Sequence, residues 1–225
     1  MKTITEYLKK WELTIIGGRP AMGKTTFALN LAQELTHQNQ SVLYCMLEMD
    51  KGDAIQNYNY TGCFMMDDTP RQKVSGIRSI LQKQKDESNP ITTVIIDYVQ
   101  LMDADLRKEN RDDELLQILQ DLKRMAVEEN ISVTATSQLC RARTPEPRKE
   151  KDPHMDDLPF SSCWDEVVDC VFLLYRPAYF GVYEDRIGET ENRMDITVAF
   201  SREKTCRYIY YEFIKKQKNY QRALF

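Results

Sequence analysis

One glycine-rich octet constrains this chain more than any other feature. Residues 18–25 read Gly-Arg-Pro-Ala-Met-Gly-Lys-Thr and fit the pattern G-x-x-x-x-G-K-[ST] in full. A β-rich run precedes the octet at residues 13–17, and an amphipathic helical stretch follows at residues 25–38, which is the setting that a phosphate-binding loop requires. A glycine turn ahead of a core helix is the alternative. The complete motif between strand and helix favours the phosphate-binding loop.

This loop predicts a site for a nucleoside triphosphate with Mg²⁺. Main-chain N–H groups around such a loop form an anion nest, and the helix that starts near its end adds a positive dipole. Lys24 is expected to reach the β- and γ-phosphates, and the Thr25 hydroxyl to bind Mg²⁺. The predicted nucleotide-binding residues are contiguous: Gly18, Arg19, Pro20, Ala21, Met22, Gly23, Lys24, Thr25 and Thr26.

Strand-like and helical runs alternate along most of the chain, which predicts an α/β fold. Such alternation indicates right-handed crossovers and a mostly parallel central sheet flanked by helices. Three later β-rich runs have little helix between them and predict an antiparallel extension at one edge. The predicted strands are residues 13–17, 41–47, 92–97, 131–137, 167–175, 194–202 and 207–214, and the predicted helices are residues 25–38, 74–85 and 112–130.

Length and composition limit the domain organisation and the class of protein. The 225 residues are expected to form a single domain, 1–225, with a short N-terminal segment at 1–12 and an exposed loop at 141–159 that holds four prolines. A net charge of −4 gives no global attraction to nucleic acid or to an anionic membrane. No apolar run approaches the roughly 18 residues of a membrane-spanning helix, and the polar first residues are not a signal peptide. The six cysteines form no C-x-x-C pair, so a reducing, cytoplasmic setting is expected.

Three polar residues follow predicted strands, at the edge where open α/β sheets bind ligands. Asp97 ends an apolar run and fits the Walker B arrangement, in which an aspartate holds Mg²⁺ through its water shell; an Asp that starts a turn is the alternative. Glu48 could orient and deprotonate an attacking water, although an exposed acid that opens a loop fits equally well. The Gln138 amide could contact the γ-phosphate and report nucleotide state, which spacing alone leaves open.

Together these motifs resemble the RecA-like ATPase domain of DnaB-type replicative helicases. The stretch TIIGGRPAMGKTTFALNLA is similar to that family's first motif, LYCMLEM to its second, VIIDYVQLM to its third and ATSQLCR to its fourth, in the same order. The segment 157–176 also resembles the family's next block. The resemblance implies ATP and Mg²⁺ as ligands, ATP hydrolysis with Lys24, Glu48 and Gln138 as catalytic residues, and action on single-stranded DNA as a homo-oligomer, such as a hexameric ring.

The chain also departs from the family. Residues 1–12 do not resemble the family's N-terminal helical domain, which suggests a separate protein partner in its place. The segment between Glu48 and Asp97 is shorter than is usual for the family. Residues 160–163 replace an Arg-Glu-Ser-Gly-like run that helps the family to hold single-stranded DNA. Hydrolysis is therefore better supported than strand separation.

A second departure concerns the arginine that completes a neighbour's site. Residues 200–204 read Phe-Ser-Arg-Glu-Lys where the family has a Lys-Gln-Arg-Asn-Gly-like motif. The resemblance implies that Arg202 is the arginine finger, with Phe200 in place of the companion lysine. Such a trans arginine can be worth roughly 10³ to 10⁵ in rate.

Basic residues in the predicted loop at 141–159 are candidates for DNA contact. In a ring of RecA-like subunits such loops line the channel and grip phosphates. Five acidic residues of the same loop offset the charge, so a solvated loop is the alternative. The candidates are Arg141, Arg143, Arg148, Lys149 and Lys151.

Three functions are left open by the sequence. The leading one is a DNA-dependent ATPase related to replicative helicases. A regulatory or accessory ATP-binding protein that does not unwind DNA is the second, and a recombinase- or KaiC-like ATPase is the third.

Overall fold

The fold is built on one large twisted sheet. The computed structural model describes residues 4–48, 58–140, 152–159, 164–202, 208–214 and 219–222. Within them, nine strands pair in the order β11-β10-β9-β6-β1-β5-β4-β2-β3. The strands from β6 to β3 in this order run parallel, and β9, β10 and β11 continue the sheet antiparallel. This confirms the predicted mostly parallel sheet with an antiparallel extension at one edge.

The bounds of the elements agree with the predicted runs to within a few residues in most places. The sheet strands are β1 Leu13–Gly18, β2 Val42–Met46, β3 Phe64–Asp67, β4 Thr93–Asp97, β5 Ser132–Gln138, β6 Cys170–Tyr175, β9 Arg193–Ser201, β10 Tyr208–Ile214 and β11 Asn219–Arg222. The α-helices are α1 Lys24–His37, α3 Val74–Gln84, α4 Arg111–Glu128 and α5 Trp164–Val167. Short 3₁₀ helices are η1 Ile4–Tyr7, η2 Val99–Leu101, η3 Met155–Asp157 and η4 Pro177–Phe180, and β7 Glu184–Asp185 pairs with β8 Gly188–Glu189 in a small hairpin.

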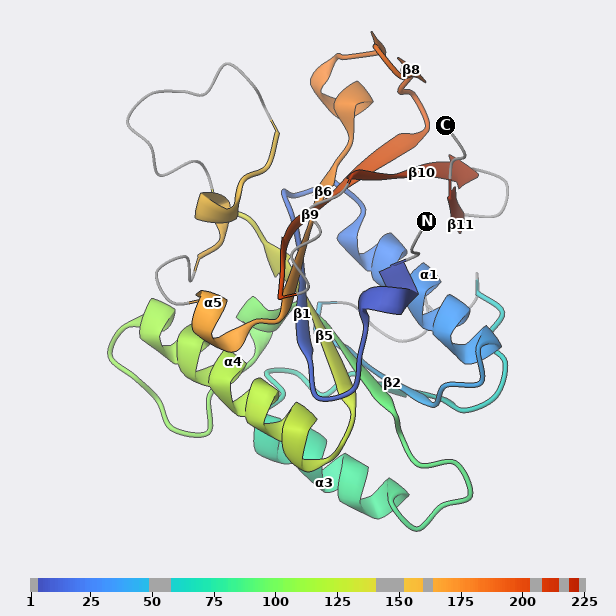
Figure 1. Ribbon diagram of the computed structural model, residues 1–225. Helices are drawn as coiled ribbons and strands as arrows, with labels where there is room; N and C mark the ends of the chain where they lie inside the picture. The colour runs from blue at the N-terminus through green and yellow to red at the C-terminus, as the bar shows by residue number, and fades with distance from the viewer. Residues whose placement is uncertain are drawn as a thin grey trace.

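Helices cover both faces of the sheet (Figure 1). Strand residues alternate between the two faces, so Leu13 and Ile15 of β1 pack with α3 and α4, whereas Ile16 packs with α1 and η1. Each of these strand residues is fully buried. The core therefore has two layers, one on each side of the sheet, and the parallel strands end together at the edge that carries the turn into α1.

The structure corrects several predictions. The predicted strand at 167–175 begins later, because residues 164–167 form α5 and Val167 packs into the core from that helix. The predicted exposed loop at 141–159 does not extend to its end, because Asp157 and Leu158 are buried beside η3. The strand β3 was not predicted, since its Phe-Met-Met-Asp sequence is only half-buried and lacks a clear alternation.

Candidate nucleotide site

The octet forms a tight turn between β1 and α1, as predicted. Gly23 is the N-cap of α1 with φ 85°, in the left-handed region, and no side chain caps the helix. Ala21 also has a positive φ of 63°. Helix geometry leaves the N–H groups of the first turn, from Lys24 to Thr26, without carbonyl acceptors in the helix. The first turn of α1 is therefore open to an anion.

The Lys24 side chain folds back over this turn. Its Nζ donates to the Arg19 carbonyl at 3.3 Å, and a Cβ on Gly18 would lie 3.1 Å from the Lys24 Cγ, so the lysine stem passes closely over a bare backbone. Burial lowers the pKa of Lys24, and the carboxylates of Asp97 and Glu48 oppose that shift. The ammonium therefore lies near both predicted acidic residues.

Asp97 is held in place by two hydroxyl groups from the strands on either side of β4. It is buried, with 1% of its surface exposed. Tyr44 of β2 donates to Asp97 Oδ2 at 3.1 Å, and Thr136 of β5 donates to Oδ1 at 2.6 Å. Burial, followed by the charge of Asp97, raises the pKa of Tyr44 well above its ordinary value, so the phenol stays protonated and donates. The carboxylate is fixed in orientation before any ligand binds.

Glu48 lies immediately beside this position. The Leu47 N–H donates to the Asp97 carbonyl at 2.9 Å, so the chain that leads to Glu48 is bonded to the end of β4. Glu48 itself is exposed. Its charge contributes to raising the pKa of Tyr98, after burial. The Glu48 carboxylate thus lies close enough to Lys24 for its charge to act on the ammonium.

Gln138 lies alongside the start of the loop. It is the register partner of Gly18 in the β1–β5 pair, and the Leu139 N–H donates to the Gly18 carbonyl at 3.2 Å. Gln100 fastens it from the other side: Gln100 Nε2 donates to the Gln138 carbonyl at 2.8 Å, and Gln100 Oε1 accepts from the Gln138 N–H at 3.2 Å. The end of β5 is thereby tied both to the loop and to the segment after Asp97.

Arg19 connects the loop to η3. Its guanidinium lies 3.7 Å from the Asp157 carboxylate and 6.0 Å from the centre of the Phe180 ring. The Asp157 carbonyl accepts the Cys140 N–H at 2.8 Å. The described residues on both sides of the segment 141–151 therefore meet next to the loop. Arg141, Arg143, Arg148, Lys149 and Lys151 lie outside the described residues, so their predicted DNA contact stays a prediction.

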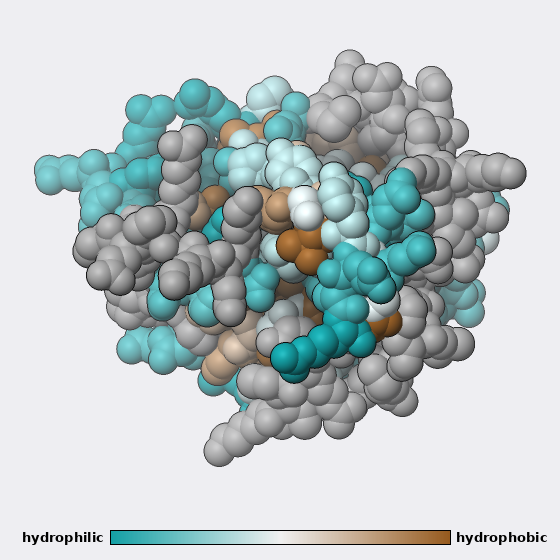
Figure 2. Space-filling model, turned by 90° about the horizontal axis from the view of Figure 1, so that it is seen from above, coloured by the Kyte–Doolittle hydropathy of each residue, from teal (hydrophilic) through white to brown (hydrophobic). Residues whose placement is uncertain are grey.

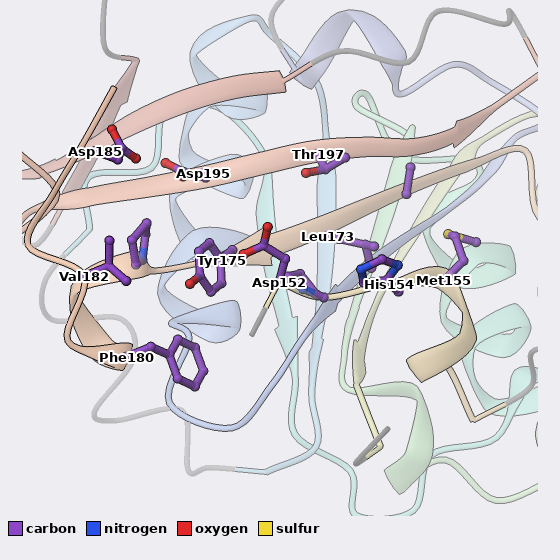
Figure 3. A pocket seen from close by; sticks show the side chains of 13 residues that line it. Asp152, His154, Met155, Leu173, Tyr175, Phe180, Val182, Asp185, Asp195 and Thr197 are labelled. Atoms are coloured by element: carbon purple, nitrogen blue, oxygen red, sulfur yellow. The ribbon is translucent and has the colours of Figure 1, made fainter. Parts of the chain in front are cut away.

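A pocket of about 720 Å³ opens beside Phe180 between β6, β9 and the residues that lead into η3 (Figure 3). Asp152, Asp185 and Asp195 contribute carboxylates, and Tyr175 and Phe180 contribute stacked rings with centres 5.6 Å apart. Burial raises the pKa of both Asp195 and Tyr175. Two of these carboxylates, Asp185 and Asp195, are paired with Arg193 of β9.

Arg202 lies at the opposite end of the parallel strands from the octet. It follows β9, which runs antiparallel to β6, and its N–H donates to the Asp169 carbonyl just before β6 begins. Leu13, at the start of β1, accepts the Asp169 N–H, and the octet begins five residues further along the strand at Gly18, or roughly 17 Å away at about 3.3 Å per residue. The structure thus brings together the loop, Glu48, Asp97 and Gln138 but not Arg202.

Seen from above, a small apolar area lies near the centre of the view, with hydrophilic residues beside it (Figure 2). Among the described residues no three His, Cys, Asp or Glu side chains are grouped to hold a metal ion. The chemistry of Thr25 and buried Asp97 fits Mg²⁺, which is usually bound by one or two protein oxygens together with phosphates and water.

No helix in the described part of the chain is long and apolar enough to cross a membrane.

Sequence reasoning missed Tyr44, Thr136 and Gln100 as supports of the site. A signal exists for the first two, because a hydroxyl in an otherwise apolar buried strand needs a partner. Which partner it finds depends on strand order, which the sequence pattern does not contain.

Comparison with known proteins identifies the family. The model of the DnaB-like helicase C-terminal domain matches residues 1–61 and 53–222. The chain belongs to this family. The chain is 34% identical over 230 residues to a probable replicative DNA helicase of Trieres chinensis. The aligned region spans 88% of this chain and 49% of that protein. It is 32% identical over 247 residues to the replicative DNA helicase DnaB of Geobacillus stearothermophilus, and that aligned region spans 95% of this chain and 53% of the relative. The chain thus spans about half the length of these relatives.

Solved structures agree with this placement. One solved ATPase domain superposes with a TM-score of 0.82 at 27% identity, covering 96% of the chain and 86% of that domain. A DnaB-like replicative helicase, studied with its interactions with primase, gives the same TM-score and identity over 95% of the chain and 59% of its own. The RecA-like fold that the motifs predicted for this DnaB-type domain is confirmed.

Proposed function

We propose that this DnaB-type domain binds ATP with Mg²⁺, hydrolyses it, and acts on single-stranded DNA in replication as part of a homo-oligomeric ring. The observation that carries the proposal is the convergence of Lys24, Glu48, Asp97 and Gln138 on one sheet edge around an uncapped helix N-terminus. Relatives named as replicative DNA helicases support the same function.

Each residue of the site has its own role in the proposed reaction. The open first turn of α1 and the Lys24 ammonium bind the phosphates and offset their charge. Thr25 and Asp97 would hold Mg²⁺, which neutralises phosphate charge when bound. Glu48 orients the attacking water and accepts its proton, and Gln138 contacts the γ-phosphate from β5. Two hydrogen bonds between the Gln138 backbone and the Gln100 side chain tie this residue to η2, which follows β4.

Two variants test the site. Lys24→Ala should abolish ATP binding, because it removes the cation that binds the β- and γ-phosphates. Glu48→Gln should keep ATP binding and lower turnover by about 10² to 10⁴, because the amide cannot accept the proton. Binding is measured with a fluorescent ATP analogue and turnover by phosphate release. Glu87→Gln, at an exposed position beyond α3, is the control and should match the unmodified chain.

The DNA part of the proposal has its own measurement. Turnover should rise when single-stranded DNA is added, and the stimulation should fade as salt increases because counterion release drives phosphate contacts. Tight ATP binding with a turnover rate that single-stranded DNA does not change would instead support an accessory ATP-binding protein that does not unwind DNA. Normal turnover in Glu48→Gln would remove Glu48 as the general base.

A further inference from the structure

Asp169 is the centre of a buried polar cluster at the sheet edge opposite the nucleotide site. It is 5% exposed. Its Oδ2 accepts from the Leu13 N–H at 2.8 Å and from Lys123 Nζ at 2.7 Å, and its Oδ1 accepts from Arg202 Nε at 2.7 Å. The carboxylate therefore binds β1, α4 and the end of β9 to one point.

Arg202 is held by this cluster without being buried in it. Its Nη2 donates to the Asp165 and Glu166 carbonyls at 3.4 and 3.3 Å, its backbone N–H donates to the Asp169 carbonyl, and its side chain stays 49% exposed. A guanidinium that is held at Nε and Nη2 but remains half exposed can still reach a group that lies against this end of the sheet.

The charge of the cluster also leaves the arginine available. The charges that act on Glu12 include the Asp169 carboxylate and three cations, Lys9, Lys123 and Arg202. Lys123 shares the Asp169 carboxylate, so Arg202 is not fully neutralised by its ion pair and can still stabilise a phosphate.

We infer that Asp169 is a positioning residue that presents Arg202 to the nucleotide site of an adjoining copy of the chain. This inference rests on the proposed ATP hydrolysis by a homo-oligomer and on the family resemblance that implies Arg202 as the arginine finger, because Arg202 lies roughly 17 Å along the strands from the octet of its own chain. In this role Asp169 acts through its hydrogen bond with Arg202.

Mixing of variants tests the inference. Asp169→Asn keeps the size of the side chain but removes the charge that holds Arg202. Alone, it should bind ATP normally and lower turnover at least tenfold. Mixed with Lys24→Ala it should regain activity, because the Lys24→Ala subunit supplies a well-placed Arg202 to the intact loop of its neighbour. Mixed with Arg202→Ala it should regain none, because neither subunit then presents the arginine.

The controls separate positioning from folding. Asp121→Asn removes an ion pair to Arg124 on the same helix as Lys123 and should leave turnover unchanged. In an Arg202→Ala background, Asp169→Asn should cause no further loss of turnover. If Asp169→Asn does not fold, Asp169→Glu, which keeps the charge but shifts it by one methylene, gives the same mixing test.

The outcomes distinguish the two proposals. Recovery between Asp169→Asn and Arg202→Ala, or full activity of Asp169→Asn alone, overturns the role of Asp169 while the shared site stands. No recovery between Lys24→Ala and Arg202→Ala, with turnover intact in the unmodified chain, overturns the shared site and the inference together.

Discussion

The hydroxyl of Tyr44 is a single group that orients Asp97, the aspartate of the proposed Mg²⁺ site. Tyr44→Phe leaves Asp97 Oδ2 without its donor in a buried position, which costs about 1–3 kcal/mol. We expect the free energy of unfolding to fall by about that amount in urea. We also expect the Mg²⁺ concentration for half-maximal ATP turnover to rise several-fold, because Thr136 alone then orients the carboxylate. A Mg²⁺ titration at fixed ATP measures this effect.

Tyr60 offers a matched control for this prediction. Its ring stacks on Phe64 with centres 3.6 Å apart, and Phe64 lies 6.5 Å from the Tyr44 ring. Its hydroxyl is buried and has no hydrogen-bond partner among the described residues. Tyr60→Phe should therefore leave stability unchanged or raise it, and the Mg²⁺ requirement should stay the same. Equal effects of the two variants would contradict the role of Tyr44.

Among the elements, the β7–β8 hairpin is joined to the sheet by an ion pair between Asp185 and Arg193. Arg193 of β9 donates to Asp185 from two guanidinium nitrogens and to Asp195 from Nε, whereas Tyr183 and Ile187 are exposed. The hydrogen bonds from Arg193 lower the pKa of Asp185 from 3.8 to about 2. Because this pKa is depressed, the stabilisation is fully present above pH about 4 and is lost as the pH falls toward 2.

We therefore expect the hairpin to open locally in acid before the sheet does. Hydrogen exchange of the hairpin amides, compared with those of β6 at the same pH, should accelerate between pH about 4 and 2. In Asp185→Asn the hairpin should exchange fast at every pH, since the charge is absent. Glu184→Gln, at the exposed neighbouring position, should keep the acid transition. A transition that persists in Asp185→Asn would exclude this ion pair as its cause.

For the molecule as a whole, the octet and Arg202 lie at opposite ends of the parallel strands of one sheet. An isolated copy then lacks the arginine that completes its site, so ATP turnover per molecule should rise with protein concentration. A trans arginine is worth roughly 10³ to 10⁵ in rate, so the effect is large. A dilution series of turnover, run beside sedimentation with ATP and Mg²⁺, measures it. Turnover per molecule that stays flat while the oligomer dissociates would rule out a shared site.

The sequence by itself determined the elements and the loop. Strand and helix periodicity, the octet and the polar residues after strands are local patterns, because backbone geometry fixes which neighbouring side chains share a face. Hence β1, α1, β4 and α4 were located closely, and Lys24, Asp97, Glu48 and Gln138 were placed at the correct edge. The half-buried strand β3 and the buried end of the loop at 157–159 were missed, because neither has a clear period.

The tertiary structure decided what surrounds these residues. Tyr44 and Thr136 reach Asp97 across 53 and 39 residues of sequence, and Asp169 reaches Leu13 across 156. Strand order determines such pairs, and no local period records which strand becomes the neighbour of another. The chain thus encoded its phosphate-binding loop in adjacent residues, whereas the orientation of Asp97 and the support of Arg202 exist only once distant strands lie side by side.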